Sequence, residues 1–264
     1  VCALERHANR LTHALVENKS GRQAISAQIF IDATGDADLC HLAGEETESL
    51  DSNVPCGWFY YLLDGTLHLD KCSHAFSPDL TREDGNGPFF RGDDSQQVTG
   101  MILASRNLLR QRLAELRQRN PSADIQMLAP PTIPCFRATR RLVAQFSLTA
   151  DHAHHWFDDT CGLISDWRKP GPVWSIPWRC LSAANTSNLA VAGRCISAAT
   201  SVWDVTRALP GCAVTGEAAG TAAALAVRQC RADLHRLTVA HLQETLRQNG
   251  ALLDAALIQP PEAT

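Results

Sequence analysis

The 264-residue sequence has little or none of what several classes of protein require. Its ten cysteines include no C-x-x-C pair, which argues against zinc ribbons, iron–sulfur clusters and redox dithiols. The net charge of −4 is small, so no basic surface for nucleic acid is indicated. No apolar run is long enough for a membrane helix, and the N-terminus lacks the apolar core of a signal peptide. These absences predict a cytoplasmic protein with free thiols that binds neither nucleic acid nor membrane.

Two nucleotide-binding fingerprints are missing as well. A dinucleotide site usually combines a strand, GxGxxG and a helix with a downstream acidic residue, and no such unit occurs here. Gly85 and Gly87 form a G-x-G, but no strand pattern precedes them and no helix pattern follows. Gly211 and Gly216 have the spacing of P-loop glycines without the following Lys and Ser/Thr, so ATP is not indicated.

The sequence does have an ordinary globular composition, 45% hydrophobic and 20% charged, and one informative stretch at 188–227. A buried strand is predicted at 189–192, followed by the turn Gly193-Arg194 and later by a helix at about 215–228. Small residues at a helix start let an anionic or carbonyl-bearing group approach the free N–H groups. The alternative is that they only let the helix pack tightly on a sheet. The small-residue start comprises Gly216, Ala218, Ala219, Gly220 and Thr221.

A second turn follows a strand predicted at 24–33. This strand becomes continuously apolar towards its end, as strands buried in a parallel sheet do. Thr34, Gly35 and Asp36 come directly after it, at the edge where open α/β sheets bind ligands. Gly35 permits a sharp turn, and Asp36 is predicted to be the N-cap of a short helix. Without a ligand, the same residues would form an ordinary strand–turn–helix corner.

The middle of the chain has a different character. Residues 46–96 are polar with turn signals such as Asp64-Gly65, which predicts short antiparallel strands and loops. Amphipathic spacing predicts a helix at 97–120, and a further helix is predicted at 237–248.

Arginines are concentrated at Arg137, Arg140 and Arg141. Guanidinium groups bind carboxylates and phosphates in a bidentate manner, so Arg137 and Arg140 are candidate anchors for an acidic substrate. The alternative is that they form ion pairs with acidic loops such as Asp158-Asp159.

A histidine cluster offers a different chemistry. His152, His154 and His155, with Asp158 nearby, could hold a metal ion, although no distant element supplies a further ligand. The alternative is a solvated loop.

Several short motifs occur in a characteristic order: IDATGD from Ile31, RATRR from Arg137, IPWRCL from Ile176, VAGRCISA from Val191, and then TRALPGC and TGEAAGTAAALAV. In this succession the chain resembles the FAD-dependent oxidoreductases, within the two-dinucleotide-binding-domain flavoproteins. The resemblance implies FAD as cofactor. The positions that it places beside FAD are Thr34, Gly35, Asp36, Gly193, Arg194, Gly216, Ala218, Ala219, Gly220 and Thr221.

The expected fold class is α/β, with a partial FAD/NAD(P)-binding (Rossmann-like) sheet and an inserted α+β substrate domain. Residues 1–45 and 182–230 would belong to the FAD-binding domain and 46–181 to the inserted substrate or cap domain. Residues 231–264 would form a C-terminal helix and tail. Thr34-Gly35 and Gly216 are expected at the same edge of one sheet, and Arg137 or Arg140 in the cleft between the domains.

The activity implied by the resemblance is hydride transfer between flavin and a small substrate, for which the arginines favour an acidic one. Because the GxGxxG unit is absent, we expect the C-terminal portion of a longer flavoenzyme, with FAD weak or absent and little activity alone. Its partner would be the missing N-terminal FAD-binding segment, and a homo-oligomer is left open. Two alternatives are a non-catalytic binding or assembly module that has lost the cofactor, and a metal-dependent enzyme using the cluster from His152 to Asp158.

Overall fold

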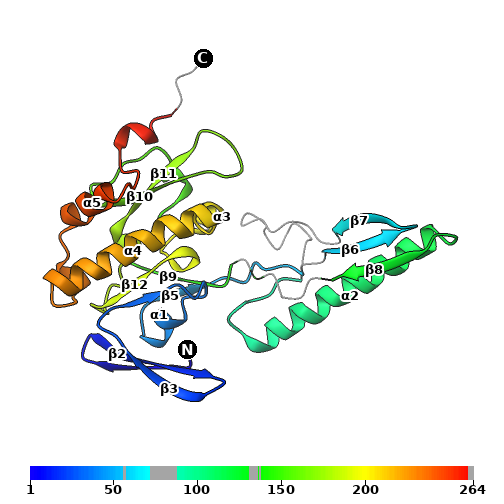
Figure 1. The fold of residues 1–264 in the computed structure, drawn as a ribbon, viewed down its shortest axis with the longest axis horizontal. Helices are drawn as coiled ribbons and strands as arrows, with labels where there is room; N and C mark the ends of the chain where they lie inside the picture. The colour runs from blue at the N-terminus through cyan, green and yellow to red at the C-terminus, as the bar shows by residue number, and fades with distance from the viewer. Residues whose placement is uncertain (56–57, 72–87, 131–135, 137, 261–264) are drawn as a thin grey trace. The chain divides into compact units, whose positions relative to one another are not determined.

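The fold was analysed in a computed structural model, which describes residues 1–55, 58–71, 88–130, 136 and 138–260. The chain divides into two compact units (Figure 1). Unit 1 comprises Val1–Glu48 and Arg140–Thr264, and unit 2 comprises Ser49–Thr139. The expected inserted domain ended at residue 181, so this boundary is corrected to residue 139. The correction follows because the later strands pack into the core of unit 1.

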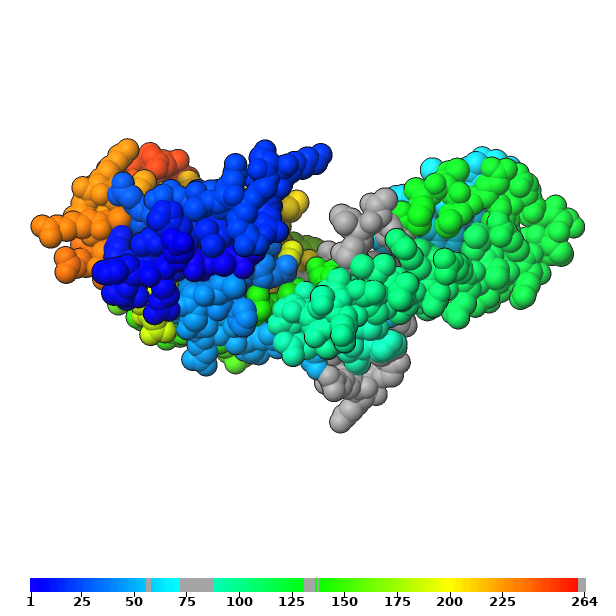
Figure 2. Space-filling model, turned by 90° about the horizontal axis from the view of Figure 1, so that it is seen from below, coloured from blue at the N-terminus to red at the C-terminus, as the bar shows by residue number. Residues whose placement is uncertain are grey.

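Unit 1 begins with an antiparallel sheet in the order β1-β2-β3, formed by β1 (Ala3–His7), β2 (Arg10–Asn18) and β3 (Gly21–Ser26). Every residue of β3 is exposed, and Figure 2 shows this N-terminal segment, in blue, on the surface. A separate strand, β4 (Phe30–Asp32), enters the core and pairs in parallel with β12 (Leu189–Val191).

The prediction of a single strand at 24–33 is therefore wrong, because β3 ends at Ser26 and β4 begins only at Phe30. The buried side chain of Asn188 explains the break. Its Nδ2 donates to the carbonyl oxygens of Leu11 and Gln28 at 2.9 and 3.0 Å, and its Oδ1 accepts from Leu11 N–H at 2.9 Å. Asn188 thus takes up backbone groups that a continuous ladder would have used.

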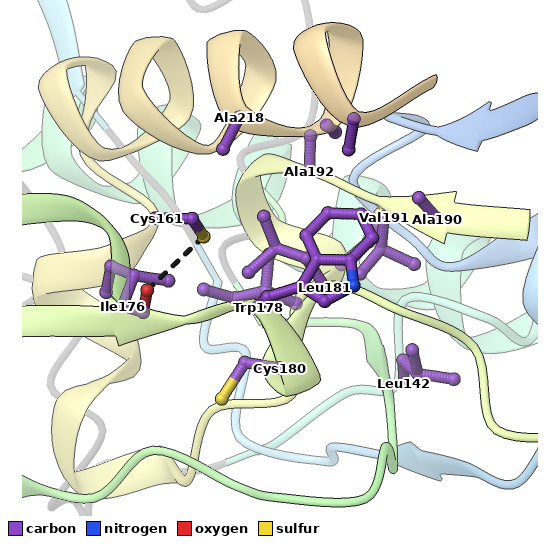
Figure 3. Packing of buried hydrophobic residues seen from close by; sticks show 14 of the residues in the cluster. Leu142, Cys161, Ile176, Trp178, Cys180, Leu181, Ala190, Val191, Ala192 and Ala218 are labelled. Atoms are coloured by element: carbon purple, nitrogen blue, oxygen red, sulfur yellow. Dashed lines mark hydrogen bonds between the residues drawn. The ribbon is translucent and has the colours of Figure 1, made fainter. Parts of the chain in front are cut away.

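The remaining elements of unit 1 surround the β4–β12 pair. A hydrophobic core joins the strands to the long helix, and Figure 3 shows part of it, including the hydrogen bond from Cys161 Sγ to the carbonyl oxygen of Ile176 at 3.3 Å. The elements are α1 (Asp38–Leu42), β5 (Thr47–Ser49), β9 (Arg140–Leu142), β10 (Thr160–Ser165), β11 (Val173–Pro177), α3 (Thr200–Thr206), α4 (Leu209–Gln229) and α5 (Val239–Gln248). Short 3-10 turns lie at Ala150–His152, Trp178–Cys180, Gly193–Cys195, Leu234–Arg236 and Ala255–Ile258.

Helix α4 begins at Leu209, so the predicted start near Thr215 is wrong. Pro210 stands in the first turn, where proline lacks only an N–H that would be unpaired anyway. Gly211 is required there, because a Cβ would lie 2.6 Å from the carbonyl oxygen of Thr206.

Because α4 begins at Leu209, the small residues at 216–221 have a different structural role from the one predicted. The segment 216–221 lies in the helix interior, where backbone N–H groups bond within the helix. Ala218 and Ala219 have no exposed surface and belong to the core. Close packing of helix on sheet, the alternative considered above, therefore explains these two alanines.

Unit 2 has a three-stranded antiparallel sheet in the order β7-β6-β8, with β6 at Trp58–Leu63, β7 at Thr66–Lys71 and β8 at Ile125–Ala129. Helix α2 (Ser95–Arg119) packs on it around Phe59 and Leu109. Both the antiparallel strands and the helix predicted at 97–120 are confirmed. Among the helices that the structure describes, none has the length and apolarity needed to cross a membrane.

Candidate functional site

The carboxyl ends of β4 and β12 lie side by side, with Val191 opposite Asp32 in the parallel register. The turn after β4 and the 3-10 turn after β12 touch, because Cys195 Sγ accepts the N–H of Gly35 at 3.1 Å and of Ala37 at 3.4 Å. These two turns, residues 33–38 and 193–195, are called the paired turns below.

Helix α4 reaches the same edge. The hydroxyl of Thr215 accepts the Gly193 N–H at 2.9 Å, and a Cβ on Gly193 would lie 3.3 Å from Cys212 Sγ in the first turns of α4. Thr215 directly precedes Gly216, so α4 contacts the edge that carries Gly35 one residue before Gly216, and the placement of Gly216 itself stays a prediction.

Asp32 organises the first of the paired turns. Its carboxylate has no exposed surface, and Oδ1 accepts the N–H of Thr34 at 3.1 Å and its hydroxyl at 2.8 Å. Oδ2 accepts the N–H of Cys40 at 3.0 Å in helix α1. The sequence interpretation missed this role. The available signal was an aspartate at the end of a buried strand, because a buried carboxylate needs hydrogen-bond donors.

Thr34 lies four residues before helix α1 and accepts hydrogen bonds from the turn that leads into it. Its Oγ1 accepts the N–H groups of Asp36 and Asp38, each at 3.2 Å. The N-cap predicted at Asp36 is therefore wrong: the N-cap residue is Ala37, in a left-handed conformation at φ 50° and without a side-chain cap. The Asp36 carboxylate is instead paired with Arg194.

Two arginines hold the outer side of this turn. Arg194 Nε donates to the Gly35 carbonyl oxygen at 3.1 Å, and its Nη2 lies 3.1 Å from Asp36 Oδ1. Arg140 Nε donates to the Asp36 carbonyl oxygen at 3.0 Å, and its Nη2 donates to Asp38 Oδ1 at 2.7 Å. Gly35 has φ 81°, and a Cβ there would lie 2.4 Å from Arg194 Nη2, so glycine is required by both conformation and space.

The substrate-anchor prediction is affected by this arrangement. The Arg140 side chain is only 8% exposed and is engaged by the turn, so a substrate carboxylate would have to displace Asp38. Arg137 lies outside the described residues.

Cys195 serves as a hydrogen-bonding centre of the paired turns. Burial, followed by the charge of Asp32, raises the pKa of its thiol to about 12. The thiol therefore stays protonated near neutral pH, with Asp32 Oδ1 at 3.6 Å as its acceptor. All seven cysteines among the described residues are unpaired.

The N-terminus of α4 remains open at the edge. Its N-cap, Ala208, has no capping side chain, and Leu209 is 86% exposed. In this first turn Pro210 has no N–H and the Cys212 N–H donates to the Ala208 carbonyl oxygen at 2.9 Å, so the N–H groups of Leu209 and of the buried Gly211 are the ones that lack a capping side chain. This arrangement can place a partial positive charge beside the paired turns.

The histidines are engaged within unit 1. Thr149 N–H donates to His152 Nδ1 at 3.0 Å, and His154 Nδ1 lies 2.6 Å from the Ile258 carbonyl oxygen. Across the described parts of the chain, no group of three or more His, Cys, Asp and Glu side chains could hold a metal ion. The metal-dependent alternative therefore has no support.

Taken together, the fold is mixed α/β, and the site is an edge where two parallel strands end beside a helix N-terminus. The family model for FAD dependent oxidoreductase matches residues 1–53 and 92–246. The chain therefore belongs to this family, and the resemblance seen in its motifs is confirmed. No curated protein and no solved structure matches the chain.

Proposed function

We propose that this chain provides the flavin side of an FAD site in an enzyme that transfers hydride between a small substrate and the flavin. The observation that carries the proposal is the convergence of three elements at one edge. The paired turns bond to each other through Cys195, and Thr215, in the second turn of α4, bonds to Gly193, which supports the proposal. Ligands of open α/β sheets bind beyond the carboxyl ends of the strands.

The residues present fit a group that carries carbonyl oxygens. The first turn of α4 has no capping side chain, and the exposed Thr34 lies in the first of the paired turns. Gly35 and Gly193 adopt φ values of 81° and 66°, which shape the two turns without side chains. We therefore move the proposed helix contacts from residues 216–221 to Leu209 and Gly211, and we keep Thr34, Gly35, Asp36 and Gly193 as proposed contacts.

FAD, when bound, would supply the hydride-accepting ring. The residues of the chain would orient that ring and stabilise negative charge on it. The partial positive charge at the N-terminus of α4 favours an anion by about 0.3–1 kcal/mol at an exposed site. Arg194 would act indirectly, by fixing Gly35 and Asp36. Arg137 is retained as the proposed anchor for an acidic substrate. The Rossmann-like sheet and the inserted substrate domain are also retained as proposals.

Titration with flavins of different size tests this proposal. A chain that holds only the flavin side should bind riboflavin or FMN about as well as FAD, and should bind ADP weakly. FAD binding should itself be weak, because each charge-assisted hydrogen bond to the pyrophosphate that a GxGxxG unit would add is worth roughly 1.5–3 kcal/mol. The purified chain should be colourless, and it should become yellow with FAD when a strand–GxGxxG–helix segment is supplied.

Quenching of flavin fluorescence measures these affinities directly. Preference for ADP over riboflavin would contradict a flavin-side site. No flavin binding even with the added segment would favour the non-catalytic binding module.

A further inference from the structure

Arg140 occupies an unusual position in the chain. It is the first residue of unit 1 after the chain leaves unit 2, and it begins strand β9. On one side of it, the Leu50 N–H donates to the Thr139 carbonyl oxygen at 2.8 Å. On the other, the Val143 N–H donates to the Glu46 carbonyl oxygen at 2.9 Å. The two passages of the chain between the units are thus hydrogen-bonded to each other, which fixes the backbone of Arg140.

The side chain of Arg140 leaves this fixed strand for the first of the paired turns. Two hydrogen bonds of this side chain reach the backbone carbonyl of Asp36 in the turn and the carboxylate of Asp38 at the start of α1. A planar guanidinium can satisfy two such acceptors at once, whereas an ammonium group is a single point charge. The geometry therefore matches an arginine that sets the position of a loop.

We propose that Arg140 is a positioning residue, which holds the turn at 33–38 in the conformation that receives the cofactor. The inference rests on the proposed function for the identity of the cofactor, but the hold on the turn can be measured without it. Arg140 acts through Asp36 and Asp38, and Arg194 fixes the other end of the same turn through Gly35 and Asp36.

Arg141 provides a matched control. It is the next residue on the same strand and is equally buried, at 7% exposed against 8% for Arg140. Successive residues of a strand face opposite sides, and Arg141 pairs with Glu48 on β5 instead of with the turn. Arg140→Met and Arg141→Met each remove one buried guanidinium and keep a long apolar side chain.

The experiment is hydrogen exchange by mass spectrometry on the 264-residue chain, following peptides that contain residues 33–40. The N–H groups of Gly35, Ala37 and Cys40 are bonded in this segment and report on its opening. Arg140→Met should accelerate their exchange by about tenfold or more, the effect of losing one or two charge-assisted hydrogen bonds. Arg141→Met should leave these rates within about twofold. Equal acceleration in both variants, or none in Arg140→Met, would overturn the proposal.

Two further variants distinguish local opening of the turn from general unfolding of the chain. Arg140→Lys keeps the charge near Asp38 but loses the second bond, so its exchange rates should lie between wild type and Arg140→Met. Asp38→Asn breaks the ion pair from the other side and should accelerate the same peptide while peptides from α5 stay unchanged. Acceleration spread equally over α5 would show loss of fold and contradict a local hold.

A riboflavin titration of the same variants separates this inference from the proposed function. Weaker binding in Arg140→Met but not in Arg141→Met would support both. Unchanged riboflavin affinity in Arg140→Met would overturn the positioning role toward the cofactor and leave the flavin site standing. Absence of riboflavin binding in the wild type, even with the strand–GxGxxG–helix segment supplied, would contradict the proposed function, while the exchange rates would still decide whether Arg140 holds the turn.

Discussion

Replacing Thr215 by valine removes the hydrogen bond that joins α4 to the end of β12, together with the bonds that the same hydroxyl donates to the carbonyl oxygens of Gly211 and Cys212. Thr215 is 1% exposed, and its hydroxyl is the acceptor for the N–H of the buried Gly193. Valine has nearly the same shape and a similar helix propensity, so neither a cavity nor a change in the helix complicates the result. An N–H left without an acceptor in the core costs about 1–3 kcal/mol. For a chain of this size we expect the midpoint of thermal unfolding to fall by about 2–4 °C per kcal/mol.

The matched control is Thr221→Val on the same helix, where the hydroxyl has no partner among the residues that the structure describes. Urea unfolding followed by circular dichroism would give the free energy of unfolding of both variants. Thr215→Val should be less stable than Thr221→Val by at least 1 kcal/mol. A difference smaller than about 0.5 kcal/mol, the usual scatter of surface substitutions, would refute the view that this bond fixes the helix against the strand.

Two more predictions concern the same edge. Gly211→Ala should destabilise by about 1–3 kcal/mol, because its Cβ would meet the carbonyl oxygen of Thr206 at 2.6 Å. Gly216→Ala, with open space around the Cβ, should stabilise by about 0.4–1 kcal/mol, and the reverse order in thermal melts would contradict the observed start of α4. For Cys195, burial raises the folded pKa from 9.0 to about 12, so the unfolded chain releases its proton first as the pH rises, and stability should fall between about pH 9 and pH 12. Urea unfolding at several pH values should show a shallower decline for Cys195→Ala, and an identical slope would argue against a buried neutral thiol.

Local features of the sequence determined much of the secondary structure. The apolar spacing of the helix predicted at 97–120 and the turn signal Asp64-Gly65 in unit 2 were sufficient, as was Gly193 as the end of β12. These features depend on interactions between residues close in sequence, which periodicity and turn chemistry reflect directly. The succession of short motifs likewise indicated the family, because each motif lies within a few residues.

Only the tertiary structure decided which residues do what at the site. Asn188 interrupts the strand predicted at 24–33 by a hydrogen bond to Gln28, although the two residues are 160 positions apart in the chain. Arg140 and Arg194 are drawn to the turn of Asp36 across more than 100 residues, so they hold the turn instead of standing free for a ligand. Composition and periodicity do not specify which distant donor meets which acceptor. That choice depends on the packing of strands and helices, which brings a buried carboxylate such as Asp32 to its donors.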